Sequence, residues 1–123
     1  MAINKVVEGL TYAAEGAVDH SSNLHKIATI NSSEKVALCG DGAIPLGVLT
    51  EVDIADRPVT VQFGGIAKVL LGGTVNAGGV VASGAAGTGV AAAVNDFGLG
   101  IALRGGVSGD IIPVALTYAT RGV

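Results

Sequence analysis

The chain has 123 residues, half of them apolar, with ten acidic and seven basic residues and a formal net charge of −3 at pH 7. A chain of this length buries enough surface for one compact core. Its charges are scattered and form no basic stripe, which argues against nucleic acid as a partner. A single cysteine, Cys39, excludes an intramolecular disulfide, so we expect synthesis in a reducing cytoplasm.

The composition predicts an all-β fold. Twenty glycines and many Val, Thr and Ala residues, with only 14% charged residues, favour short strands joined by tight turns over long amphipathic helices. Because aromatic residues make up 3% of the chain, the core has to be aliphatic. With so few charges, a free monomer would expose apolar patches of the kind that mark protein contacts, which predicts an oligomer.

The first 24 residues lack a clear pattern. The apolar residues Ile3, Val6 and Leu10 fit neither the helical period nor strand alternation. The segment also has no basic leader and no apolar run with a cleavage site, so no secretory signal is expected. We therefore predict an irregular N-terminal arm over residues 1–24 and a β-domain over residues 25–123.

From Leu24 onward the chain reads as short strands separated by turn residues. The clearest strand alternates apolar Val59, Val61 and Phe63 with polar Thr60 and Gln62, which is typical of a half-buried strand. The predicted strands cover residues 26–30, 35–39, 45–52, 59–63, 66–71, two short segments within 74–94, then 97–103 and 110–118.

The turns between these segments predict hairpins. A polar turn joins 26–30 to 35–39, a glycine-rich loop joins 97–103 to 110–118, and Gly64 with Gly65 suggests that strand 59–63 pairs with 66–71. Pro113 cannot donate a ladder hydrogen bond, so the last strand should lie at an edge or carry a bulge. The expected architecture is a small antiparallel β-barrel or sandwich.

No group of residues forms a catalytic pattern. His20 and His25 lack neighbouring metal ligands and are read as surface histidines. Ser21 and Ser22 lie near them, without an oxyanion-hole or nucleophile-elbow pattern. The glycine-rich stretch 84–89 lacks the residues that complete a nucleotide loop and is read as a turn. We predict no enzyme activity and no catalytic residue.

Metal, cofactor and membrane binding are also not expected. Asp41, Asp53 and Asp56 do not have the spacing of a calcium loop, and they are read as solvated turn carboxylates. Cys39 ends an apolar run and is assigned to packing. Residues 69–95 carry no charge, yet the stretch is too rich in glycine and too poor in large apolar residues for a membrane helix.

Five short motifs follow one another along the second part of the chain: V-x-V at 59–61, G-x-A-x-V at 65–69, G-x-x-V within 78–83, G-x-A at 100–102 and G-D-x-x-x-V within 109–116. With this series of motifs, residues 35–116 resemble the cement, or head decoration, proteins of tailed phages. In that family a V-x-V strand precedes a G-x-A-x-V strand, a G-x-x-V element, a G-x-A strand and a closing G-D-x-x-x-V strand. The motifs of this chain follow in the same order.

The resemblance implies a non-enzymatic virion protein on the outer capsid surface. Its partners would be the major capsid protein and itself, commonly as a homotrimer, and it would bind the expanded head and bridge major capsid subunits. Separately, the poor periodicity before Leu24 suggests that the N-terminal arm reaches a neighbouring subunit or the capsid surface, for example by adding a strand to an exposed sheet edge. Two alternatives stay open: a glycan- or host-surface-binding module of a virion, and an enzyme subunit whose active residues lie on another chain.

Overall fold

The computed structural model describes residues 10–118, which form ten strands and no helix. Five strands make up one antiparallel sheet and five the other. The strands of the first sheet are β1 (Thr11–Glu15), β2 (Ile27–Ile30), β3 (Val36–Leu38), β4 (Gly47–Glu51) and β5 (Pro58–Gln62). Those of the second are β6 (Ile66–Leu70), β7 (Val80–Ser83), β8 (Gly89–Ala91), β9 (Gly98–Ala102) and β10 (Ile111–Ala115).

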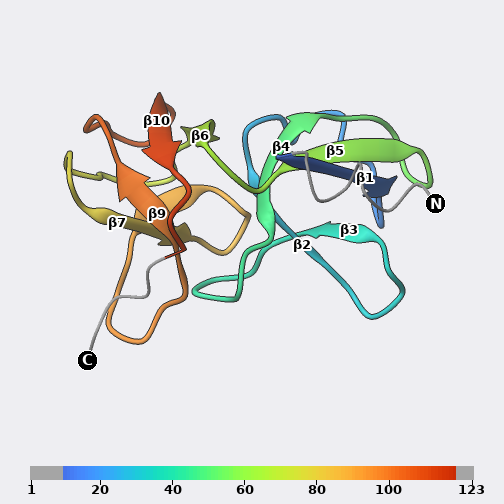
Figure 1. Cartoon of the computed structure of the whole chain (residues 1–123), viewed down its shortest axis with the longest axis horizontal. Helices are drawn as coiled ribbons and strands as arrows, with labels where there is room; N and C mark the ends of the chain where they lie inside the picture. The colour runs from blue at the N-terminus through green and yellow to red at the C-terminus, as the bar shows by residue number, and fades with distance from the viewer. Residues whose placement is uncertain (1–9, 119–123) are drawn as a thin grey trace.

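Each sheet is built from one half of the chain. The strand order is β1-β5-β4-β2-β3 in the first sheet and β6-β10-β9-β7-β8 in the second. Figure 1 shows the two halves as adjacent lobes, the first in blue to green and the second in yellow to red, with β4 and β6 between them. We call them the first half and the second half.

The predicted fold class is confirmed. The chain is all-β, and of the two predicted architectures the structure is a sandwich of two sheets rather than a barrel. Each predicted strand between residues 26 and 118 overlaps an observed one. The predicted hairpins β2–β3 and β9–β10 are both formed.

One predicted pairing is wrong. Strand β5 does not pair with β6, because β1 and β4 occupy its two edges and β6 pairs with β10 instead. The connection through Gly64 and Gly65 therefore carries the chain from the first sheet to the second. Turn residues such as these show where a strand ends, but they do not determine which strand it pairs with.

Pro113 also differs from expectation, because β10 lies between β6 and β9 rather than at an edge, and its pairing with β6 runs without a bulge. The Pro113 carbonyl accepts a hydrogen bond from the Leu103 amide, 3.0 Å away. The Pro113 nitrogen faces the same side, where β9 has already ended at Ala102. The missing N–H thus falls just beyond the β9 ladder.

The segment predicted as an arm, residues 1–24, contains β1, which pairs along its whole length with β5. Residues 1–9 of the predicted arm lie outside the described residues. Beyond β1, the amide of Ala17 donates to the carbonyl of Val36 at 2.8 Å, so this part of the chain is tied to the first sheet.

The two halves are structural repeats of each other. All ten described residues with positive φ fall into five pairs whose members lie 53 residues apart. A positive φ is uncommon outside glycine, so this coincidence reflects equivalent backbone turns. The pairs are His25 and Gly78, Glu34 and Gly87, Gly42 and Asn95, Asp56 and Gly109, and Gly65 and Tyr118.

Strand registers and hydrogen bonds repeat with the same offset. Ile27 pairs with Val48 in the first sheet, as Val80 pairs with Ile101 in the second. A Cβ added to Gly47 would collide with the Gln62 carbonyl, and one added to Gly100 with the equivalent Ala115 carbonyl. Before residue 21 the offset is 55, because the first half carries the two additional residues Ser21 and Ser22.

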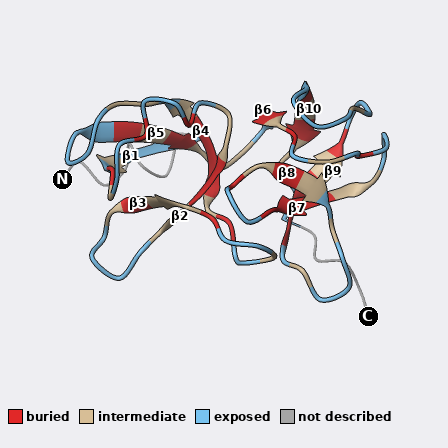
Figure 2. Ribbon diagram, turned by 180° about the vertical axis from the view of Figure 1, so that it is seen from behind, coloured by how far each residue is buried: buried red, intermediate tan, exposed pale blue. Residues whose placement is uncertain are grey.

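Each half has an inner and an outer sheet face. The inner face of the first sheet carries one apolar cluster, which includes Ala28, Leu49 and Val61. The second cluster joins the inner face of the second sheet to three outer-face residues of the first half, Ile27, Cys39 and Val48. The first half thus stacks its outer face on the inner face of the second half, with buried residues gathered on the strands (Figure 2).

Candidate binding surface

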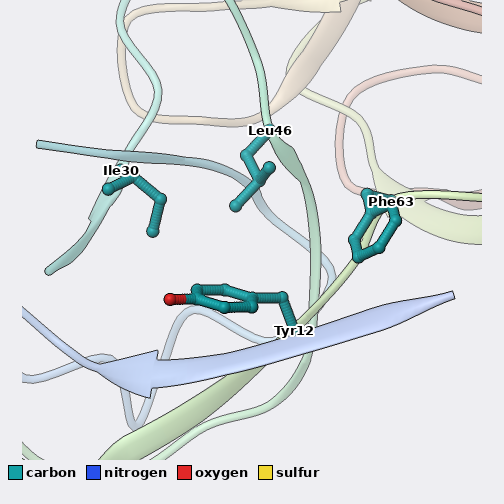
Figure 3. A pocket seen from close by; sticks show the side chains of 4 residues that line it. All are labelled: Tyr12, Ile30, Leu46 and Phe63. Atoms are coloured by element: carbon teal, nitrogen blue, oxygen red, sulfur yellow. The ribbon is translucent and has the colours of Figure 1, made fainter. Parts of the chain in front are cut away.

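The inner face of the first half forms an open apolar pocket of about 320 Å³. Figure 3 shows four side chains around it, contributed by β1, β2 and the segments that flank β4 and β5. They are Tyr12, Ile30, Leu46 and Phe63. With an apolar lining and one phenol hydroxyl, this surface can bind another apolar surface by burial of area.

The same place is closed in the second half. The residues equivalent to the pocket lining are Ala67, Ser83 and Leu99, which are buried, and Leu116, which packs against the core. The outer face of the first half covers them. The first half has no corresponding cover among residues 10–118, and Tyr12 is therefore 41% exposed.

Tyr118 holds two of the pocket segments from the side of the second half. Its hydroxyl lies 2.7 Å from the Leu46 carbonyl oxygen and 3.0 Å from that of Phe63, and its proton is shared between these acceptors. Burial disfavours the phenolate and raises the pKa of Tyr118 to about 12. The hydroxyl is therefore a hydrogen-bond donor at physiological pH, and it anchors the pocket wall.

The prediction of surface histidines is wrong for His20, which is fully buried. Its Nε2 donates to the Val36 carbonyl at 2.9 Å, while Nδ1 accepts from the Asn23 side-chain amide at 2.9 Å. A loop histidine becomes buried here because both ring nitrogens find partners. His25 is half-buried and has a positive φ of 70°.

Ser21 and Ser22 are exposed, and the His20 ring is bonded to other groups. Hydrogen bonding from the Ser21 hydroxyl, and then from the Ser21 amide at 2.9 Å, lowers the pKa of the Asp19 carboxyl. The structure therefore places these serines in a capped turn beside a structural histidine.

The acidic residues lie in separate turns, with Asp41 and Asp56 exposed and Asp53 half-buried. The Asp56 carboxylate accepts from Lys35 Nζ at 2.7 Å, which raises the pKa of the lysine. Among residues 10–118, no three potential ligands from His, Cys, Asp and Glu come together as a metal site. The same residues contain no helix long and apolar enough to cross a membrane.

Cys39 is buried, as predicted from its position at the end of an apolar run, and burial raises the pKa of its thiol. The glycine-rich stretch 84–89 forms the predicted turn, which connects β7 to β8. The Gly87 carbonyl in this turn accepts from the Ile27 amide at 2.6 Å and so joins the two halves.

Sequence reasoning missed the pocket. Its lining comes from residues 12, 30, 46 and 63, which only the sheet topology brings together. The one signal available was the scarcity of aromatic residues, because Tyr12 and Phe63 are two of the four in the chain. Aromatic residues outside a small aliphatic core are common at interfaces.

No protein-family model matches the sequence, and no curated protein matches it. Among solved structures, the chain is similar to the N base of head fiber gp8.5 in bacteriophage phi29, with a TM-score of 0.70 and 16% identity. The match covers 92% of this chain and 98% of that one. At this identity the likeness establishes a common fold over nearly the whole of both chains.

Proposed function

We propose that this protein is a structural component of a phage virion, carried on the outer surface of the head. The supporting observation is its fold, shared over 92% of the chain with the N base of a phage head fiber. The motif pattern over residues 35–116 leads to phage head decoration proteins by a separate route. A mechanical role of this kind needs no catalytic group and no cofactor.

In the finer form of this proposal, the protein is a cement protein that binds the expanded head and bridges major capsid subunits, as a homotrimer. A protein that binds one state of a lattice more tightly stabilises that state by its differential affinity. Repetition over many equivalent sites multiplies the effect, so packaged nucleic acid presses against a reinforced shell.

The decisive experiment is cosedimentation of the purified protein with undecorated heads of the encoding phage, before and after expansion. Saturable binding to expanded heads alone supports the cement role. Equal binding to both forms supports a decoration role without selection for expansion. Binding to neither form contradicts the proposal.

The part of the predicted arm that precedes β1 is tested in the same assay. A chain lacking residues 1–9 keeps β1 and the entire first sheet, so its fold should be unchanged. Weaker binding to heads by this truncated chain supports a role of the N-terminal residues in reaching a neighbouring subunit. Unchanged binding removes that role.

A further inference from the structure

We propose that copies of this protein associate head to tail, with the outer face of the second half of one chain covering the open inner face of the first half of the next. The contact would repeat the one that already joins the two halves within a chain. This inference concerns the free protein, so it does not depend on the proposed role at the capsid.

The first of the two surfaces is the outer face of the second half, on which no other part of residues 10–118 packs as the second half packs on the outer face of the first half. Ile27, Cys39 and Val48 on the outer face of the first half are 0% exposed, because they pack on the second half. Their equivalents are all apolar and only half-buried. These equivalents, Val80, Ala92 and Ile101, form the outer face that we propose as the covering surface.

The second of the two surfaces is the open pocket on the inner face of the first half. Tyr12 is 41% exposed whereas its equivalent Ala67 is 2% exposed, and Leu46 is half-buried whereas Leu99 is 0% exposed. The burial missing from the first half is thus the burial that an outer face supplies in the second half. One chain carries both complementary surfaces, which is why we assign a second copy as the occupant.

Main-chain hydrogen bonds between the halves indicate how the copies would be aligned. The Leu70 amide donates to the His25 carbonyl at 2.9 Å, from the free edge of β6. The equivalent donor is the Glu15 amide of β1, which is the edge strand of the first sheet. In the proposed contact, the Gly78 carbonyl of one copy accepts a hydrogen bond from the Glu15 amide of the next.

A second bond fixes the other side of the contact. The Ile27 amide donates to the Gly87 carbonyl at 2.6 Å within the chain. By the 53-residue offset, the Val80 amide of one copy would donate to the Glu34 carbonyl of the next. The two bonds together allow one orientation of the copies, in which different surfaces meet. Such a head-to-tail contact forms a closed ring when the rotation between successive copies closes, as the proposed trimer requires.

The test uses two charge substitutions in the full-length chain, Tyr12→Asp on the open inner face and Ile101→Asp on the outer face. Sedimentation velocity should show assemblies for the unmodified protein and monomers for each variant alone. An equimolar mixture of the two variants retains one intact contact, between the inner face of the Ile101→Asp chain and the outer face of the Tyr12→Asp chain. The mixture should therefore form dimers and nothing larger.

Ile54→Asp and Val107→Asp serve as matched controls, because these equivalent residues are exposed in both halves, by 51% and 55%, away from the internal contact. Both variants should assemble like the unmodified protein. Circular dichroism checks that every variant is folded. A monomeric unmodified protein, assembly by either face variant alone, or a mixture that stays monomeric would overturn the proposal.

Since no heads are present, these outcomes are separate from the capsid-binding test. A protein that assembles but does not bind heads would retain the head-to-tail contact and lose the proposed function. A protein that binds heads but stays monomeric would retain the proposed function and lose the head-to-tail contact.

Discussion

His20 shows how a polar residue is tolerated in an aliphatic core. Its equivalent in the second half is Val75, which is also buried, so the site accepts either a bonded imidazole or an apolar side chain. The difference lies in the surroundings, because the buried Asn23 side chain depends on the His20 ring as an acceptor.

We expect His20→Val to destabilise the protein, although valine is the native residue at the equivalent position, Val75, in the second half. Val36 keeps a hydrogen bond from Ala17, but the Asn23 amide loses its acceptor, and an unpaired buried polar group costs about 1–3 kcal/mol. Urea denaturation measures this loss. The exposed Ser22→Ala should stay within about 0.5 kcal/mol of the original protein. Equal stability of His20→Val and the original protein would contradict the assignment.

Tyr118 gives a prediction at alkaline pH. Its pKa is about 12 in the folded protein against the ordinary 10.0, because burial disfavours the phenolate. The stability that depends on the neutral phenol is complete below pH 10 and falls as the pH rises from 10 towards 12. Urea denaturation across this range should show a steeper decline for the original protein than for Tyr118→Phe.

Cys39 titrates in the same direction, but it is present in both proteins and cancels in their difference. Tyr118→Phe also loses the hydrogen bonds to Leu46 and Phe63, which lowers its stability at neutral pH by about 1 kcal/mol. Parallel pH curves for the two proteins would show that Tyr118 is not protected from ionisation.

Equivalent strands of the two halves differ in whether the other half packs over them. Strands β4 and β9 have the same place in their sheets and approach a neighbouring strand at an equivalent glycine, Gly47 or Gly100. The residues just before those glycines, Leu46 and Leu99, differ in burial, since only Leu99 lies beneath the other half.

We therefore expect unequal effects of the same truncation at the two positions. Leu99→Ala should cost about 2–5 kcal/mol, as is usual for a fully buried leucine. Leu46→Ala should cost about 1 kcal/mol in the monomer. Urea denaturation at low protein concentration makes the comparison, so that association does not contribute. Similar costs at both sites would show that the first-half pocket is already closed in the single chain.

At the scale of the whole molecule, the two halves are repeats that cannot be separated without exposing a core. The second half completes its cluster with Ile27, Cys39 and Val48 from the first half. A core shared in this way couples the stability of its two contributors, so the chain should unfold as one unit.

Ile27→Ala tests this coupling. Removal of this buried side chain should cost about 2–5 kcal/mol. Because Ile27 belongs to the first half but fills the second, hydrogen exchange should accelerate in both β4 and β9. The exposed Val18→Ala serves as the control and should change neither segment. Acceleration confined to the first half would show that the halves unfold separately.

The strand positions could be predicted from the sequence because they depend on local features. The alternation of Val59 and Val61 with polar neighbours, and the turn residues on either side, act over a few residues. The same local signals located the β7–β8 turn and the burial of Cys39.

The repeat itself is not visible in the sequence. From residue 23 onward, only four positions of the first half carry the residue found 53 positions later. Equivalent turns are formed by different residues, such as His25 and Gly78, because a backbone conformation can be stabilised by many side chains. The identical pairs are Asn23 and Asn76, Leu46 and Leu99, Gly47 and Gly100, and Val61 and Val114.

The sequence by itself determined the all-β class, the strand segments and the aliphatic core, since composition and period decide these properties locally. Only the tertiary structure decided the partners of β5, the burial of His20 and the open pocket on the first half. Each of these depends on contacts between residues far apart in the chain. Such contacts depend on how the strands are arranged in the sheets, and a pattern read along the chain does not contain that arrangement.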